Sequence, residues 1–351
     1  MVCDYITRTV NSTEKKLDVL ALVTEDVGSV PLQDDFEENR TNVDRTITDK
    51  VQAGLDYPCY PQLVGTPTKP MNMALQFLKP LAVTDPEIQI KGEEISLLSD
   101  EIVEPSDIIG TERAEYFLAF LKRNNLLGKL KGTRACVTGP FTLASYIGMK
   151  NIMTCGASKP QVVETLGRIL TKSCKRLSDL GFNIVSVDEP FLSVILGANR
   201  LLYSYDQEFV IRVLNKLIKE ISCFTSIHVC GRVTPLVKST LLTSNVDIID
   251  HEFVQSPKNQ EVYSKQELES AGKILAYGCV SSVNQRVETV EEITELLKNA
   301  LKLFGLRIMA KPDCGFGGLS GLPDAYSITF TKLRNMVQAT RDVRKSYIGD
   351  M

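Results

Sequence analysis

The chain has 351 residues, of which 43% are hydrophobic and 24% are charged, and its net charge is −3. Its length allows one large or two ordinary domains with a sizeable core. Lysine and arginine are scattered, which argues against a nucleic-acid partner, and no apolar run approaches the roughly 18 residues of a membrane span. The nine cysteines, mostly single residues in apolar runs, and the polar N-terminus predict a protein of the reducing cytoplasm without a secretion signal.

Eight short apolar runs, rich in β-branched residues, recur along the chain. Continuous apolar runs of this length are typical of strands that are buried on both faces, as in parallel sheets. The runs occupy residues 20–29, 54–63, 133–140, 183–190, 225–231, 246–253, 274–282 and 306–315.

Helical patterns separate most of these runs. Residues 159–181 repeat apolar side chains along one face and end at Gly181, a residue suited to a helix C-terminus. Residues 206–222, 287–305 and 323–348 follow the same period. Because strands and helices alternate, the pattern predicts βαβ units and a parallel sheet. Eight strands predict an α/β fold of the (β/α)₈ TIM barrel type in a single domain.

The domain organisation follows from the same pattern. We expect residues 1–19 to be an N-terminal extension and residues 20–351 to be the barrel domain. Residues 66–106 are rich in proline and show no regular period. We therefore expect this segment to be a long loop over the mouth of the barrel.

Polar residues collect at the C-terminal end of almost every apolar run. Because the active sites of such barrels lie at the C-terminal face, these residues are the candidates for function. They are Gly28, Ser29, Gln62, Thr138, Asp188, Glu189, His228, Cys230, Glu252 and Cys314.

A histidine and two cysteines among these residues suggest a metal site. His228 and Cys230 stand in one run, and the last run ends in Asp313 and Cys314. The run between them ends in Asp250, His251 and Glu252, which could supply a carboxylate. Imidazole and thiolate ligands together favour zinc over magnesium or calcium. Buried cysteines and single histidines are more often packing residues, so both interpretations stay open on these residues alone.

The spacing of these residues resembles the zinc site of the cobalamin-independent methionine synthase family. "KPDCGFGGL" is similar to that family's N-P-D-C-G motif, "VSVDEPFL" to its Q-x-D-E-P, and "ACVTGPFTL" to its L-T-G-P-x-T. "EDVGSVP" resembles the I-G-S-F-P that opens its catalytic barrel. The motifs follow one order from about residue 20 to the C-terminus.

This resemblance implies a role for each candidate residue. His228, Cys230, Glu252 and Cys314 would hold Zn²⁺, with the thiol of homocysteine displacing Glu252 during catalysis. Asp188 would accept hydrogen bonds from the substrate ammonium group. The backbone of Gly28 and Ser29 would hold the substrate carboxylate, and Gln62 could accept a hydrogen bond from the ammonium without a charge to pair with it.

The chain departs from the family at three points. It has no room for the second, N-terminal barrel of the folate enzymes. Residues 278–285, "GCVSSVNQ", lack the family's D-x-H stretch, whose histidine is thought to transfer a proton to folate. Gln62 stands where the family has a glutamate that contacts the substrate ammonium. A tertiary-amine methyl needs a protonated leaving group, whereas a methyl-cobalt donor does not. The resemblance is therefore closest to short "core" methionine synthases, which imply a methylcorrinoid co-substrate and possible contact with a corrinoid-carrying protein.

Several other functions stay open. The acceptor could be another small thiol such as coenzyme M, although its sulfonate would lie badly beside Asp188 and Glu189. Folate-dependent methionine synthesis is a further alternative. The metal-free porphyrinogen decarboxylases share a related barrel but lack the set of His, Cys, Glu and Cys. A non-enzymatic zinc or corrinoid binding protein is disfavoured, because structural zinc sites are closed and the resemblance implies an exchangeable position here.

Overall fold

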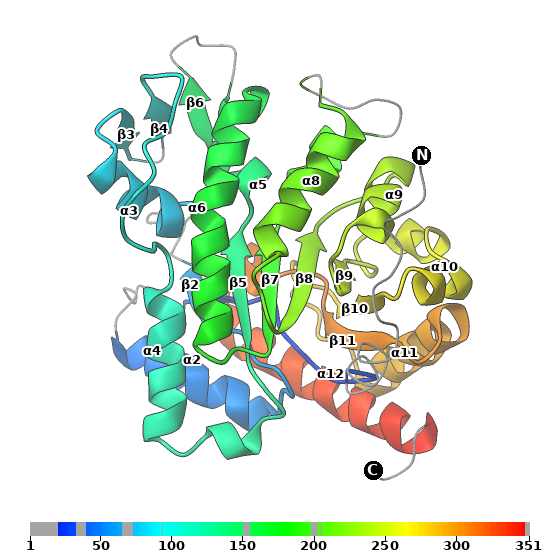
Figure 1. The fold of residues 1–351 in the computed structure, drawn as a ribbon. Helices are drawn as coiled ribbons and strands as arrows, with labels where there is room; N and C mark the ends of the chain where they lie inside the picture. Colours follow the sequence, from blue (N-terminus) through cyan, green and yellow to red (C-terminus); the bar gives the residue numbers. More distant parts are fainter. Residues whose placement is uncertain are drawn as a thin grey trace.

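The structure is a computed structural model, and it confirms the predicted (β/α)₈ barrel (Figure 1). It describes residues 20–32, 40–64, 73–92, 94–149, 155–197, 203 and 205–347. The expected extension over residues 1–19 lies outside these described residues. No helix in the described ranges is long and apolar enough to cross a membrane.

Six parallel strands form most of the barrel wall, in the order β11-β10-β9-β8-β7-β5. All six overlap apolar runs that the sequence marked as strands, and only β8 begins one residue before its run. Burial on both faces explains their apolar composition, because helices cover the outside and side chains fill the inside. Their bounds are β5 Arg134–Thr138, β7 Ile184–Asp188, β8 Phe224–Val229, β9 Ile248–His251, β10 Ile274–Val280 and β11 Ile308–Pro312.

The first two apolar runs close the circle between β11 and β5. They do so through single parallel bridges, which join Thr24 to Ala310, Glu25 to Tyr57 and Cys59 to Arg134. Beyond these bridges the same two runs pair as the short parallel strands β1, Ser29–Pro31, and β2, Gln62–Val64. The eight predicted runs therefore supply all eight segments of the barrel wall.

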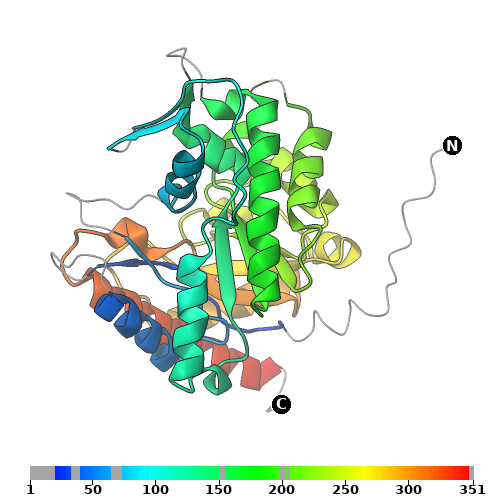
Figure 2. The same ribbon diagram turned by 60° about the vertical axis from the view of Figure 1, so that its left-hand side comes forward.

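Helices pack around the outside of the strands (Figures 1 and 2). The four helices predicted from periodicity are present as α6, α8, α11 and α12. Gly181 and Gly305, which follow α6 and α11, have φ values of +100° and +79°, a conformation that favours glycine. The helix bounds are α2 Arg40–Ala53, α3 Leu75–Thr84, α4 Glu112–Arg123, α5 Pro140–Tyr146, α6 Pro160–Asp179, α7 Leu192–Ile195, α8 Gln207–Ile218, α9 Pro235–Thr243, α10 Lys265–Ser270, α11 Val290–Phe304 and α12 Ala325–Tyr347.

The expectation of an irregular loop over residues 66–106 is wrong for much of that segment. After residues 65–72, which are not described, the chain forms α3 and then the antiparallel strands β3, Ile88–Lys91, and β4, Glu94–Leu97. β4 pairs in parallel with β6, Ile147–Met149, and the resulting sheet projects at the end of the barrel toward which the strands point (Figures 1 and 2). The pairing with β6 is a long-range contact, so local composition did not reveal it.

The start of α5 is fixed by a side chain from the neighbouring strand. Glu189 follows β7 and is wholly buried. Its carboxylate accepts hydrogen bonds from the backbone N–H groups of Phe141 and Thr142, at 3.0 and 2.9 Å, and from the Thr142 hydroxyl at 2.6 Å. A carboxylate at a helix N-terminus satisfies free N–H groups and complements the helix dipole. Glu189 is therefore a structural residue of the rim, packed against Gly139.

We predict that Gly139→Ala destabilises the protein. The added Cβ would lie 2.2 Å from the carboxyl carbon of Glu189, whose position is held by three hydrogen bonds. Overpacking of this kind costs about 1–3 kcal/mol in the free energy of unfolding, which urea denaturation measures. Gly128→Ala is the matched control, since nothing lies within 4 Å of its added Cβ. Equal stability of the two variants would contradict the close packing of Gly139 against Glu189.

Candidate metal centre

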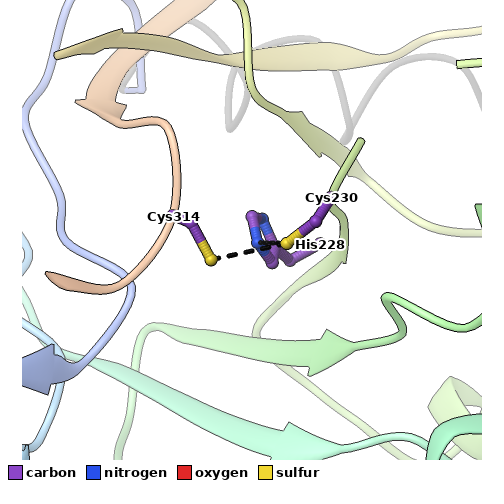
Figure 3. A group of neighbouring side chains, drawn as sticks. All are labelled: His228, Cys230 and Cys314. Atoms are coloured by element: carbon purple, nitrogen blue, oxygen red, sulfur yellow. Dashed lines mark hydrogen bonds between the residues drawn. The ribbon is translucent and has the colours of Figure 1, made fainter. Parts of the chain in front are cut away.

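Three side chains from two distant parts of the chain meet at the C-terminal end of the barrel (Figure 3). His228 lies in β8, Cys230 follows that strand, and Cys314 follows β11. One ligand atom from each lies within 4.8 Å of the others. His228 Nε2 is 2.9 Å from Cys230 Sγ, which is 3.4 Å from Cys314 Sγ. The structure thus brings together three of the four predicted ligands.

Strand geometry explains why His228 and Cys230 share a face. Residues two apart on a strand point to the same side, so both side chains face the inside of the barrel. Gly231, with a φ of +82°, then turns the chain away from the strand direction. Cys314 reaches the same place because β11 runs parallel to β8 and also ends at this rim.

Asp250 sets the orientation of the His228 ring. The two residues are partners in the register between β8 and β9. His228 Nδ1 donates a hydrogen bond to Asp250 Oδ1 at 2.7 Å, which leaves Nε2 directed at the thiols. Histidine ligands of metals are commonly fixed in this way by a carboxylate on the second ring nitrogen. Asp250 is thus placed to orient a ligand.

Asp250 itself lies in a wholly buried cluster of charges. Arg134 Nη2 is 3.0 Å from Asp250 Oδ2, and Lys311 Nζ is 2.7 Å from Oδ1. Arg134 Nη1 also contacts Glu25 Oε1 at 2.8 Å. Burial tends to raise the pKa of Asp250, but the charges of His228 and Lys311 outweigh it and hold the pKa well below its usual range. Burial raises the pKa of Glu25 to about 7, against the lowering effect of Arg134.

The same charges act on the three converging side chains. Burial disfavours a charged His228, but Asp250 reverses this and raises the pKa of the imidazole to about 10. The hydrogen bond from Cys230, followed by the effects of His228, holds the pKa of Cys314 well below its usual range. The hydrogen bond to Cys314 and burial raise the pKa of Cys230. The two thiols are therefore inequivalent, and Cys314 is the more acidic of the pair.

The donor set fits a zinc ion. One imidazole nitrogen and two sulfur atoms are typical zinc ligands, and a catalytic site has three protein ligands with an open fourth position. Bonds of about 2.0–2.3 Å in a tetrahedron put ligand atoms about 3.5–3.8 Å apart. The separations of 2.9 and 3.4 Å are shorter. A bound ion therefore requires the nitrogen–sulfur pair to part by about 0.6 Å and the two sulfur atoms by about 0.4 Å.

Glu252, the predicted fourth ligand, does not belong to this group of atoms. It lies just beyond β9 and is almost buried, and its carboxylate accepts a hydrogen bond from the Ser256 hydroxyl. Its charge is close enough to add to the raised pKa of Cys230, after the effects of Cys314 and burial. Its role as a ligand stays a prediction.

Two other side chains that the sequence offered as ligands have different partners. The Asp313 carboxylate accepts three backbone N–H bonds from residues 253–255, at 2.6 to 3.0 Å, and so ties the loop after β9 to β11. His251 is hydrogen-bonded to the Val229 carbonyl and the Tyr263 hydroxyl. Burial lowers the pKa of His251 to about 4, as expected for a neutral core histidine.

The residues around Gly28 that were predicted to contact the substrate lie near the loop after β11. Gly28 has a φ of +116°, and its carbonyl accepts the Gln62 N–H at 3.1 Å. Ser29 pairs with Gln62 in the register of β1 and β2. Its side chain packs so closely on Gly315 that a Cβ there would lie 2.6 Å from it. Gly28, Ser29 and Gln62 are therefore close to the loop that carries Cys314.

Asp188 lies next to His228 across the β7–β8 pairing. Its Oδ1 accepts a hydrogen bond from Ser186 at 3.1 Å, and burial raises the pKa of the carboxyl. Within the described ranges, no lysine or arginine forms an ion pair with Asp188. A buried carboxylate without an ion-pair partner is a suitable contact for a substrate cation.

Arg134 and Lys311 were not recognised as site residues from the sequence. Their signal was present, since each is a cation inside an apolar run, "TRACVTGP" and "LRIMAKPDCG". A charged residue within a buried strand needs a charged partner. The identity of that partner, Asp250, depends on the closure of the barrel.

These features define a (β/α)₈ barrel with an inward-facing His-Cys-Cys centre at its C-terminal rim. The chain belongs to the family described as "Cobalamin-independent synthase, Catalytic domain", whose sequence pattern matches residues 98–342.

Named relatives and solved structures agree with this family. The chain is 28% identical over 305 residues to methionine synthase of Methanothermobacter thermautotrophicus, covering 87% of this chain and 90% of that protein. Identity to methionine synthase of Methanocaldococcus jannaschii is 30% over 239 residues, covering 65% of this chain and 70% of that protein.

Among solved structures, the fold is similar to a B12-independent methionine synthase from Shewanella sp. W3-18-1 in complex with selenomethionine. The TM-score is 0.69 at 18% identity, covering 94% of this chain and 100% of that one. A methyltransferase from Methanosarcina mazei gives a TM-score of 0.65 at 13% identity, covering 96% and 99%. At these identities the likeness supports the fold.

Proposed function

We propose that this protein is a zinc-dependent S-methyltransferase that moves a methyl group to homocysteine and forms methionine. The observation that carries the proposal is the convergence of His228, Cys230 and Cys314 at the C-terminal rim. The naming of the relatives as methionine synthases supports the reaction.

Zinc held by His228, Cys230 and Cys314 would supply a site at which a substrate thiol loses its proton near neutral pH. Glu252, outside the three-atom group, is the residue proposed to yield its place to that thiol. Asp250 accepts a hydrogen bond from His228 Nδ1 and so directs Nε2 at the cysteines, where it would bind the ion.

The rest of the site fits an amino-acid thiol. Asp188 offers a carboxylate without an ion-pair partner for the ammonium group, and Ser29 packs against Gly315, next to Cys314, where its backbone could hold a carboxylate. The Gly28 N–H already donates to Asp26 Oδ2 at 3.1 Å. The Shewanella structure, solved in complex with selenomethionine, supports an acceptor of this kind. A sulfonated thiol such as coenzyme M would bring its anion toward Asp188, which disfavours it.

The methyl donor is a separate part of the proposal. The family is described as cobalamin-independent, which favours a folate donor and does not support the predicted methylcorrinoid. The end of β10 nevertheless has serines at positions 281 and 282 and no histidine. The nearby Glu288 is bonded to Lys332 and to the Ser281 N–H. Because the stretch 278–285 supplies no proton donor of its own to folate, we keep the methylcorrinoid as the donor to be tested.

We predict one tightly bound zinc per chain. Cys230→Ser and Cys314→Ser should lose it, whereas Cys174→Ser, a buried cysteine of α6, should retain it in elemental analysis.

Glu252→Gln should weaken zinc binding less than Cys314→Ser, since Glu252 is the exchangeable residue. X-ray absorption at the zinc edge should show one more sulfur ligand on adding homocysteine. An unchanged sulfur count would rule out the exchange.

We predict that Asp188→Asn raises the KM for homocysteine. Loss of the buried charge opposite the ammonium should lower kcat/KM, which corresponds to an increase of about 2–5 kcal/mol in the activation free energy. Mercaptoethanol, which has no amine, is the control substrate and should be nearly indifferent to the change. Equal losses for both thiols would mean that Asp188 only supports the barrel.

An assay of the purified, zinc-loaded protein separates the donors. With homocysteine as acceptor, methylcobalamin should be turned over and methyltetrahydrofolate should not, because no acid at the end of β10 protonates the folate leaving group. Formation of methionine is the measurement. Turnover of the folate at the rate of the corrinoid would overturn the corrinoid assignment while leaving the thiol methyltransferase intact.

A further inference from the structure

Lys311 occupies an unusual position behind the three converging side chains. It lies in β11 and is wholly buried. Its ammonium group contacts Asp250 Oδ1 at 2.7 Å and donates to the carbonyl oxygens of Pro312 and Asp313, each at 2.8 Å. These three contacts use all the donors that a lysine has.

Lys311 contacts residues that position two different candidate ligands, His228 and Cys314. Asp250 Oδ1, which it contacts, is the same oxygen that accepts the hydrogen bond from His228. The Asp313 carbonyl, which it also holds, belongs to the peptide bond that leads into Cys314. β9 and β11 are not neighbours, because β10 lies between them. The contact therefore crosses the inside of the barrel and fixes both sides of the site relative to each other.

Lys311 is not the sole cationic partner of Asp250. A buried ion pair is expensive to desolvate, and apolar residues of similar volume often serve stability equally well. Asp250 already has a cationic partner, Arg134, on its other oxygen. The presence of a second cation at Asp250, on the oxygen that also contacts His228, therefore points to a role in the site itself.

We propose that Lys311 is a positioning residue for the metal site. By holding Asp250 Oδ1 and the Asp313 carbonyl with one ammonium group, it sets the distance between His228 Nε2 and Cys314 Sγ before a metal binds. The inference rests on the proposed zinc site, and it assigns to Lys311 a part of the affinity for the ion.

The test measures zinc affinity of the full chain by competition with a chelator. Lys311→Met should weaken binding roughly 10- to 100-fold, the usual effect of losing a partner of a metal ligand. Lys332→Met is the matched control, because Lys332 is equally buried and pairs with Glu288 and the Arg286 carbonyl. It should bind zinc as the wild type does. Thermal unfolding of both metal-free variants records any general loss of stability.

A spectroscopic readout separates positioning from stability. The visible and near-ultraviolet bands of bound Co²⁺ report the geometry of its imidazole and thiolate ligands. They should shift in Lys311→Met and remain as in the wild type in Lys332→Met. If Lys311→Met does not fold, Lys311→Gln replaces it with the same expected loss of affinity.

Two outcomes are distinguishable. A wild-type chain that binds no zinc would overturn the proposed function together with this inference. A wild-type chain that binds zinc, with Lys311→Met and Lys311→Gln binding equally well and giving unchanged Co²⁺ bands, would overturn the role of Lys311 alone.

Discussion

The carboxylate of Asp250 holds the interior of this barrel together. One of its oxygens meets His228 and Lys311, and the other meets Arg134, which continues to Glu25. Charges this deeply buried are tolerated only when each is paired, so the groups of the cluster fix one another's positions. Because the residues of this cluster come from several strands of the barrel, the cluster fixes the strands relative to one another and so fixes the positions of the ligand atoms at the rim.

That base explains how two partly buried thiols and one imidazole are held within reach of a single ion. The position of Cys230 is set by the direction of β8, and the position of Cys314 is set by the turn after β11. The Asp313 carboxylate ties this turn to the loop that follows β9. The imidazole has its orientation set by Asp250. The Glu252 carboxylate accepts a hydrogen bond from Ser256 and lies outside the group of three ligand atoms, so its role as an exchangeable ligand stays a prediction.

The barrel and much of the rim could be predicted from the sequence, because apolar runs and their polar ends are local properties. His228, Cys230 and Cys314 were found for that reason. The strands β3 and β4 were missed, since their place depends on pairing with β6. Asp313 and His251 have the chemistry of ligands, and only the positions of residues 253–255 and Tyr263 show that they are engaged elsewhere. Partners across the barrel interior, such as Lys311 and Asp250, likewise require the closed fold.

The most direct measurement is anomalous diffraction at the zinc absorption edge from crystals of the purified protein. The account predicts one strong peak per chain at the C-terminal rim, bonded to His228 Nε2, Cys230 Sγ and Cys314 Sγ, with Asp250 still on Nδ1. A zinc-replete protein with its peak at other residues, or with His228 turned away from the cysteines, would contradict the account.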